Sequence, residues 1–300
     1  MHQGGSTLAV AAVQRTPVFL DREGSLEVAA AAVTEAAAGG ARLVVFPESF
    51  VPGYPDWIWR RPPMSDGEWY ARFFDQAVDP EHDLGPVQAA AREAGAWVAL
   101  GVTERLASGT LSNSVLYVDD QGELVARHRK LIPTGAERLV WGNGQEHLLT
   151  VVEIDGVRVA TLICWENYMP LARQALYEKD VDVLLSPTWD NSSTWVPTLR
   201  HIAKEGQVFV VGVTAFLRGS DVPRDLPEAD DLYGGDEDFM SRGNTTVVAP
   251  GGEVLAGPLV GEAGIVHATL ELDRIGAGRR MFDPAGHYSR PDVLRLHDST

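Results

Sequence analysis

Residues 7–46 read TLAVAAVQRTPVFLDREGSLEVAAAAVTEAAAGGARLVVF. The apolar run at 7–14 predicts a buried strand. The alanine-rich stretch at 25–38 is closed by two glycines, which predicts a helix with a glycine stop. The run RLVVF at 42–46 predicts a second strand. These elements form a β-α-β unit, and such a crossover implies that its two strands are parallel.

The same alternation of strands and helices continues along the chain. The expected elements are helices at 87–94, 170–178 and 198–205, strands at 97–103, 181–185, 208–214 and 265–272, and hairpins within 113–127, 148–163 and 245–256. Alternation with antiparallel hairpins at the margins is typical of an α/β fold with a mixed sheet covered by helices. We therefore expect a single α/β domain over residues 1–300.

The composition excludes several classes of protein. Of the 300 residues, 45% are hydrophobic and 22% are charged, which is ordinary for a globular chain and excludes a disordered, collagen-like or coiled-coil protein. A single cysteine excludes an internal disulfide framework and a cysteine-rich zinc module. The net charge of −17 would repel phosphate backbones, so we expect no nucleic-acid partner.

No segment approaches the ~18 continuous apolar residues that a membrane helix needs. The first residues lack the basic region of a signal peptide, so we expect a soluble cytoplasmic protein with no membrane partner and a reduced thiol. One long irregular stretch, residues 219–238, carries eight acidic side chains. It predicts an acidic, exposed loop, either functional or disordered.

Three predicted strands end in residues that carry chemistry, and sites in open α/β sheets lie outside such ends. Glu48 follows VVFP at 44–47, where partial burial would raise the pKa of its carboxyl group toward a base's working range. Lys130, one of only three lysines, follows the hairpin at 113–127 and is a compact cation suited to holding a developing anion. Taken singly, each is also compatible with a solvated surface position.

The third strand end carries the only cysteine, Cys164, ahead of the helix predicted at 170–178. A strand-to-helix turn exposes a nucleophile, and the helix end favours its thiolate, although a free cysteine is often a small buried hydrophobe. The three together, expected on separate strands of one sheet, indicate a site. Glu48 would accept the thiol proton, the thiolate would attack an electrophilic carbon, and Lys130 would stabilise the charge that develops.

Six segments carry a family resemblance. They are PESFVPGYP at 47–55, RKLIPT at 129–134, ERLVWG at 137–142, CWENYMP at 164–170, SPTWD at 186–190 and GHYSRPD at 286–292. Together they resemble the nitrilase superfamily of carbon–nitrogen hydrolases, which carry a Glu–Lys–Cys triad, over nearly the whole chain. Trp165 and Glu166, directly after the cysteine, are similar to the nitrilase branch rather than to the amidase branches.

The resemblance implies a four-layer αββα sandwich whose protomers pair through helices, so a homodimer or higher homo-oligomer is expected. It makes Glu48 the general base, Lys130 the stabiliser of the intermediate and Cys164 the nucleophile. The backbone N–H of Trp165 would be an oxyanion donor. Glu137 matches the family's second glutamate, and the alternative for it is a surface acid paired with a neighbouring arginine.

One departure lies beside that second glutamate. Many nitrilases carry Tyr-His where this chain has Gly135 and Ala136. The smaller pair would either widen the pocket or loosen the loop.

The activity that the resemblance implies is hydrolysis of a small-molecule nitrile to a carboxylic acid and ammonia through a thioimidate and a thioester. No metal or organic cofactor is expected, and the histidines lack the HxH or HExxH spacing of a zinc site. The alternatives are an amidase with the same triad and a non-catalytic interaction protein. An intact Glu48, Lys130 and Cys164 counts against the second.

Tryptophans gather in or near the motif loops, at Trp57, Trp59, Trp141, Trp165, Trp189 and Trp195. Ligand pockets are mostly apolar and aromatic, so an aromatic or arylaliphatic nitrile is expected, bound by Tyr54, Trp165 and Trp189. The alternative is that these rings pack the ends of the sheet.

Overall fold

The computed structural model describes residues 7–296. Its strands are β1 (Thr7–Gln14), β2 (Leu43–Val45), β3 (Trp97–Arg105), β4 (Leu111–Val118), β5 (Leu124–Arg129), β6 (Val151–Ile154), β7 (Val157–Thr161), β8 (Val183–Thr188), β9 (Phe209–Thr214), β10 (Phe216–Arg218), β11 (Phe239–Val248), β12 (Val254–Val260) and β13 (Gly264–Glu271). The α-helices are α1 (Arg22–Ala38), α2 (Gly67–Asp75), α3 (Gly85–Ala94), α4 (Pro170–Glu178), α5 (Trp195–Gly206), α6 (Ala229–Leu232) and α7 (Asp273–Arg279). Short 3-10 helices are η1 (Asp56–Trp59), η2 (Gly135–Leu139), η3 (Cys164–Tyr168) and η4 (Gly219–Asp221).

The strands form two mixed sheets. The first has six strands in the order β13-β1-β2-β3-β4-β5, and the second has seven, with β10-β11-β9-β8-β7-β6 in order and β12 paired with β11. Strand β2 runs parallel to β1 and β3, and β8 runs parallel to β7 and β9. Parallel neighbours require crossovers, and these contain α1, α3, α4 and α5.

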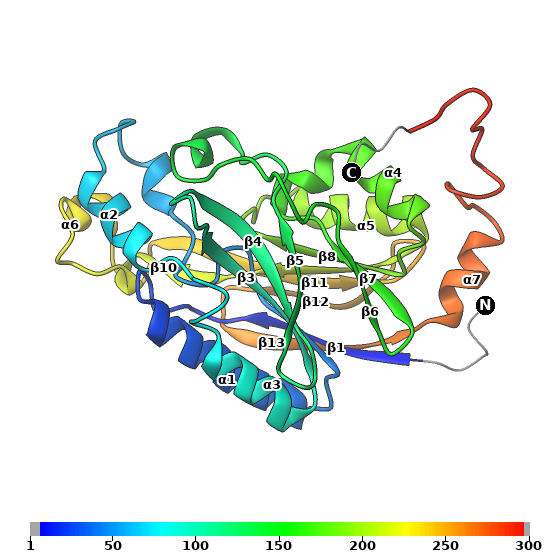
Figure 1. Cartoon of the computed structure of the whole chain (residues 1–300), viewed down its shortest axis with the longest axis horizontal. Coiled ribbons are helices and arrows are strands. Elements are labelled where there is room, and N and C mark those ends of the chain that lie inside the picture. Colours follow the sequence, from blue (N-terminus) through cyan, green and yellow to red (C-terminus); the bar gives the residue numbers. More distant parts are fainter. Residues whose placement is uncertain (1–6, 297–300) are drawn as a thin grey trace.

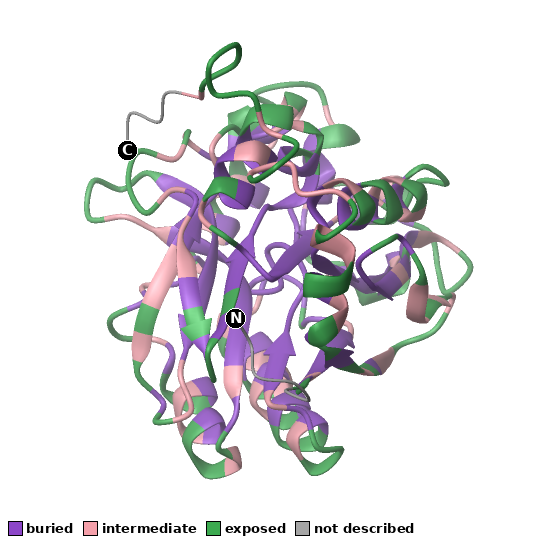
Figure 2. Ribbon diagram, turned by 90° about the vertical axis from the view of Figure 1, so that its right-hand side faces the viewer, coloured by how far each residue is buried: buried purple, intermediate pink, exposed green. Residues whose placement is uncertain are grey.

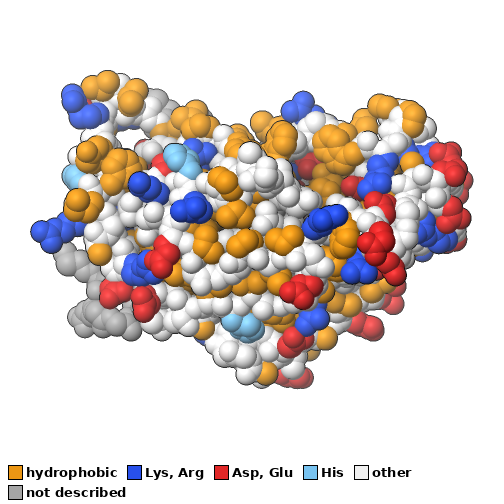
Figure 3. Space-filling view, turned by 180° about the vertical axis from the view of Figure 1, so that it is seen from behind, with side chains coloured by type: hydrophobic (Ala, Val, Ile, Leu, Met, Phe, Trp, Pro, Cys, Tyr) orange, Lys and Arg blue, Asp and Glu red, His pale blue; other side chains and the backbone are white. Residues whose placement is uncertain are grey.

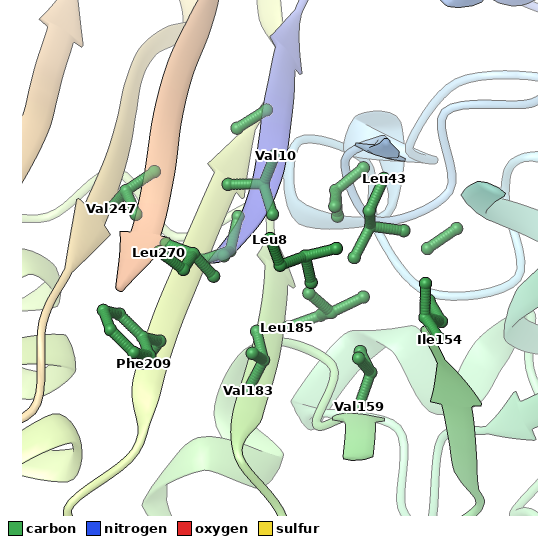
Figure 4. Close-up of a cluster of buried hydrophobic side chains, with 14 of the residues drawn as sticks. Leu8, Val10, Leu43, Ile154, Val159, Val183, Leu185, Phe209, Val247 and Leu270 are labelled. Atoms are coloured by element: carbon green, nitrogen blue, oxygen red, sulfur yellow. The ribbon is translucent and has the colours of Figure 1, made fainter. Parts of the chain in front are cut away.

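The inner core lies between the two sheets. Alternate residues of each central strand point into it: Leu8 and Val10 of β1 and Leu43 of β2 face Val183 and Leu185 of β8 (Figure 4). Their neighbours in sequence point outward, so both faces of these strands are buried (Figure 2). Strands buried on both faces read as continuous apolar runs, as they do here.

Helices cover the two outer faces. Helices α1 and α3 pack on the first sheet through small residues such as Ala29, Ala32 and Ala91. Helices α4 and α5 pack on the second sheet through Leu176 and Leu199, and Figure 1 shows the two helix pairs on opposite sides of the sheets. The four-layer αββα sandwich expected from the family resemblance is therefore confirmed.

The expectation of one mixed sheet was wrong, because the strands divide between two. Strands β2 and β5, which lead to Glu48 and Lys130, lie in the first sheet, whereas β7, which leads to Cys164, lies in the second. An apolar run that is buried on both faces carries no signal for the sheet it joins. The three strand ends therefore meet across the sandwich rather than along one edge.

Residues 219–238 are more ordered than the acidic loop that the composition predicts. Seven of the eight acidic side chains are exposed, and acidic groups gather at this end of the molecule in Figure 3. Val222, Leu226 and Tyr233 are nevertheless buried in a cluster with η1 and α2. The Arg224 guanidinium donates to four backbone carbonyls of the segment, which holds it in shape. None of the helices in residues 7–296 is long and apolar enough to cross a membrane.

Candidate active site

Glu48 lies on the loop that follows β2, and this loop packs against β3. Its side chain is almost fully buried, at 1% exposure. Ser49 adopts a left-handed backbone with φ of 46°, which turns the chain sharply after Glu48. Gly101 of β3 lies so close that a Cβ there would be 1.9 Å from the Pro47 carbonyl oxygen. The loop can therefore approach β3 only because that strand has a glycine at this position.

Lys130 follows β5 and is 1% exposed. Its Nζ donates to Oε1 of Glu48 at 2.7 Å and to Oε2 of Glu137 at 2.7 Å. Glu137 lies in η2, where its Oε2 also accepts the backbone N–H of Thr134 at 2.7 Å. A lysine buried between two carboxylates is a charged cluster with one negative charge in excess when all three groups are ionised.

Tyr54 and Trp59 extend this cluster to the surface. The Tyr54 hydroxyl donates to Oε1 of Glu137 at 2.8 Å and accepts the Trp59 indole N–H at 3.0 Å. Trp59 is half exposed, and its ring lies against Gly135, where a Cβ would be 3.0 Å from the indole. The space left by the small Gly135 is thus filled by the Trp59 ring.

Cys164 opens η3 directly after β7 and is 5% exposed. Its φ of 53° is left-handed, a strained conformation for a residue with a side chain. Asn167 fixes the turn, because its Nδ2 donates to the carbonyls of Leu162 at 2.7 Å and Cys164 at 2.9 Å. The sole thiol therefore lies on a tight, braced turn at a strand end, as predicted.

Two further groups hold Glu48 and were missed from the sequence. Nδ2 of Asn113, on β4, donates to Oε1 of Glu48 at 2.7 Å, and the backbone N–H of Trp189 donates to Oε2 at 2.8 Å. Asn113 is 1% exposed in a strand whose residues are all buried. A buried amide in such a strand is the signal that could have identified it, because a buried polar side chain needs a partner.

The residues predicted to bind substrate lie around the cluster. The Tyr54 ring stacks on that of Trp189, with centroids 4.6 Å apart and an interplanar angle of 8°. Trp165 is half exposed beside Cys164, and its indole N–H donates to Asp190 at 3.0 Å. Of the other tryptophans named from the sequence, Trp57, Trp141 and Trp195 are buried packing residues. The packing alternative therefore holds for these three rings.

Comparison with known proteins accords with this geometry. The sequence pattern of the carbon–nitrogen hydrolase family matches residues 9–280. The chain belongs to the carbon–nitrogen hydrolase family. Similar relatives are a nitrilase of Bradyrhizobium diazoefficiens, 39% identical over 91% of this chain and 86% of the relative, and an aliphatic nitrilase of Sinorhizobium fredii, 38% identical over 95% of this chain and 94% of the relative.

A solved structure supports the fold. A carbon–nitrogen hydrolase from Helicobacter pylori G27 superimposes with a TM-score of 0.76 at 21% identity, over 95% of this chain and 96% of that one. Family membership makes this protein a hydrolase that acts on carbon–nitrogen bonds.

In this carbon–nitrogen hydrolase, the charges around the buried cluster favour a base at Glu48 and a cation at Lys130. Burial raises the pKa of the Glu48 carboxyl group, and the charge of Lys130 opposes this only in part. Burial lowers the pKa of Lys130, but the nearby Glu48, Cys164 and Glu137 outweigh it, so the pKa of Lys130 lies above its usual value. Lys130 is therefore protonated, while Glu48 has the raised proton affinity expected for a general base.

The pKa of the Cys164 thiol is shifted in the direction opposite to the expected one, in which a helix end would favour the thiolate. Burial raises the pKa of Cys164, the carboxylate of Glu48 raises it further, and Lys130 lowers it only in part. The element that follows Cys164 is a 3-10 turn of five residues rather than an α-helix, so its dipole is small. The resting thiol is therefore protonated and needs a base.

Within residues 7–296, no group of three or more His, Cys, Asp or Glu side chains is arranged to hold a metal ion. The chemistry that the described cluster can perform is nucleophilic attack by a thiol, with a carboxylate as base and an ammonium group beside the developing charge.

Proposed function

We propose that this hydrolase is a nitrilase, which converts an organic nitrile and two waters into a carboxylic acid and ammonia. The observation that carries the proposal is the buried Glu48–Lys130–Glu137 cluster beside the only thiol, Cys164. The nitrilases of Bradyrhizobium and Sinorhizobium, similar over most of their length, support the choice of a nitrile over an amide.

The first step is attack on the nitrile carbon. Glu48 accepts the proton of Cys164, the sulfur forms a bond to carbon, and one bond of the C≡N triple bond becomes a lone pair on nitrogen. Glu48 then gives the proton to that nitrogen, which yields a neutral thioimidate and restores the carboxylate. Lys130 stabilises the negative charge that develops on nitrogen. The backbone N–H of Trp165, which donates to no backbone acceptor among residues 7–296, is placed after the nucleophile to assist.

Two waters complete the reaction. Glu48 takes a proton from the first water, which adds to the thioimidate carbon and gives a tetrahedral intermediate. Glu48 passes this proton, and then the proton of the new hydroxyl group, to the nitrogen, which leaves as ammonia while the hydroxyl oxygen becomes the carbonyl of a thioester. A second water, activated in the same way, adds to the thioester and releases the acid and the thiol. Expulsion of the thiol from the first tetrahedral intermediate would instead release an amide.

The substrate's side chain is proposed to be aromatic or arylaliphatic. Tyr54 and Trp189 stack beside the cluster, and the half-exposed rings of Trp59 and Trp165 flank it. Such rings favour a flat apolar group. An aliphatic nitrile is the alternative, and the Sinorhizobium relative bears that name.

The test is ammonia release from aromatic, arylaliphatic and aliphatic nitriles and from their matching amides, with Cys164→Ala as the control. We expect release from nitriles and its loss by more than about a thousandfold in the variant, since removing a nucleophile removes the covalent route. Release mainly from amides would make the protein an amidase. Ammonia from a clean Cys164→Ala preparation would contradict the nucleophile assignment.

A further inference from the structure

A fully buried histidine and glutamate lie behind the proposed active site. Nε2 of His128 is 3.0 Å from Oε2 of Glu166, and both side chains are 0% exposed. His128 lies on β5 in the first sheet, two residues before Lys130. Glu166 lies in η3, which continues from the second sheet, two residues after Cys164. The pair therefore joins the two elements that carry the cation and the nucleophile.

The carboxylate of Glu166 also binds two backbone groups. Its Oε1 accepts the N–H of Leu131 at 2.7 Å, and its Oε2 accepts the N–H of Ile163 at 2.6 Å. Leu131 is the residue directly after Lys130, and Ile163 is the residue directly before Cys164. One side chain thus bridges the two strand ends that carry the reacting groups, although these ends belong to different sheets.

The hydrogen-bonding pattern requires an ionised carboxylate at position 166. Nδ1 of His128 accepts the backbone N–H of Leu149 at 3.2 Å, so the proton of the neutral ring is on Nε2 and is donated to Glu166. Glu166 therefore receives three donors and has no need to donate. A glutamine would turn its NH₂ group toward one of them, which would leave two donors facing each other.

We propose that Glu166, oriented by His128, is a positioning residue that sets the thiol-bearing turn in register with the lysine-bearing strand end. The inference rests on the proposed function, in which Lys130 acts on the charge that Cys164 creates. Positioning of this kind matters because a displacement of about 1 Å between reacting groups can cost on the order of 100-fold in rate.

The experiment compares Glu166→Gln with a matched control, Asp182→Asn. Asp182 is a buried carboxylate, 5% exposed, whose Oδ2 accepts the backbone N–H of Arg158 in β7 at 3.0 Å. Asp182 therefore binds β7, the strand that leads to the Cys164 turn, but near the start of that strand rather than at its end. Both substitutions remove the charge of a buried carboxylate that accepts hydrogen bonds, but only Glu166 lies between the elements that carry the proposed reacting groups.

Four quantities are measured: kcat and KM on a nitrile, the rate at which iodoacetamide alkylates the single cysteine, and the melting temperature. For Glu166→Gln we expect kcat to fall about 100-fold with KM within about threefold, and alkylation to slow about tenfold. Asp182→Asn should lower the melting temperature yet keep kcat and the alkylation rate. A folded Glu166→Gln whose kcat and alkylation match those of Asp182→Asn would overturn the proposal.

A second pair of variants keeps the test decisive if Glu166→Gln does not fold. His128→Gln retains a donor toward Glu166, whereas His128→Leu removes it. We expect kcat to be about tenfold higher in His128→Gln than in His128→Leu, because loss of the donor lets Glu166 shift and displaces the reacting groups. Equal kcat in the two variants would overturn the positioning role of Glu166 and His128. Alkylation needs no substrate, so a wild-type protein that is inactive on nitriles and amides would refute the proposed function, while the alkylation rates would still test the positioning role.

Discussion

At the scale of single residues, two opposing effects set the pKa of the Glu48 carboxyl group. Burial raises the pKa of its carboxyl group, whereas Lys130 and the Asn113 amide stabilise its charged form. A general base needs both properties, because it must be ionised at the working pH and still bind a proton strongly. Asn113 is therefore the neutral partner through which the pKa of Glu48 can be changed without removing a charge.

The first prediction concerns Asn113→Leu. Loss of the Nδ2 donor removes a bond that favours the carboxylate, so the pKa of Glu48 should rise further. Below that pKa the base is protonated and cannot accept the thiol proton, so activity is lost as pH falls through it. We expect the acid limb of kcat/KM to lie above pH 4.5, the ordinary pKa of a glutamate, and to move to higher pH in the variant.

The control for that profile is Ser112→Ala on the same strand. The Ser112 hydroxyl is buried and has no hydrogen-bond partner within residues 7–296. Its removal should leave the acid limb in place. An acid limb that moves equally in both variants, or moves to lower pH in Asn113→Leu, would contradict the role given to Asn113.

At the scale of elements, the site depends on how closely a loop approaches a strand. The loop after β2 lies directly on β3, with the Val51 N–H donating to the Gly101 carbonyl at 3.2 Å. The same loop carries Glu48. A methyl group at position 101 would occupy the place of the Pro47 carbonyl, and backbone on both sides leaves no flexible side chain to yield.

We predict that Gly101→Ala lowers the free energy of unfolding by about 1–3 kcal/mol, since overpacking forces backbone to shift. Because the shift displaces Glu48, kcat per folded molecule should also fall by at least about tenfold. Urea denaturation and initial rates measure the two effects. Gly85→Ala, where a Cβ meets nothing within 4 Å, is the control, and equal behaviour of the two variants would refute the prediction.

At the scale of the whole molecule, one exposed apolar surface bears on assembly. Trp165, Tyr168 and Leu171 present exposed apolar side chains on η3 and α4, with Leu171 68% exposed. The family resemblance predicts that protomers pair through helices. A second copy covering this surface would bury these groups and repay part of the repulsion between two chains of charge −17.

We therefore predict a mass of at least twice the 32.5 kDa of one chain, measured by size-exclusion chromatography with light scattering. The salt should be physiological, where charges are screened beyond about 8 Å. Leu171→Glu should shift the mass toward the monomer, whereas Met64→Glu, at an even more exposed apolar position in the segment between η1 and α2, should not. An active wild-type monomer would rule out pairing as a requirement.

The kinds of residue in the site were readable from the sequence because strand ends are locally marked. Glu48 and Cys164 each follow an apolar run at the point where it stops, so a polar or reactive group there differs clearly from its neighbours. Lys130 ends the basic run RHRK at 127–130 and stands directly before the apolar pair at 131–132. The β-α-β order and the helices α1, α3, α4 and α5 were predictable for the same reason, since periodicity and glycine or proline stops are local signals.

Only the tertiary structure decided how these parts meet. The contact of Asn113 with Glu48 spans 65 residues and that of Tyr54 with Glu137 spans 83, and no local period encodes either. Burial, which reversed the expected direction for the pKa of Cys164, depends on every element packed around the thiol. The sequence by itself determined which chemical groups stand at the strand ends, because that is written in neighbouring residues. The division of those strands between two sheets, and so the cluster itself, follows from long-range packing.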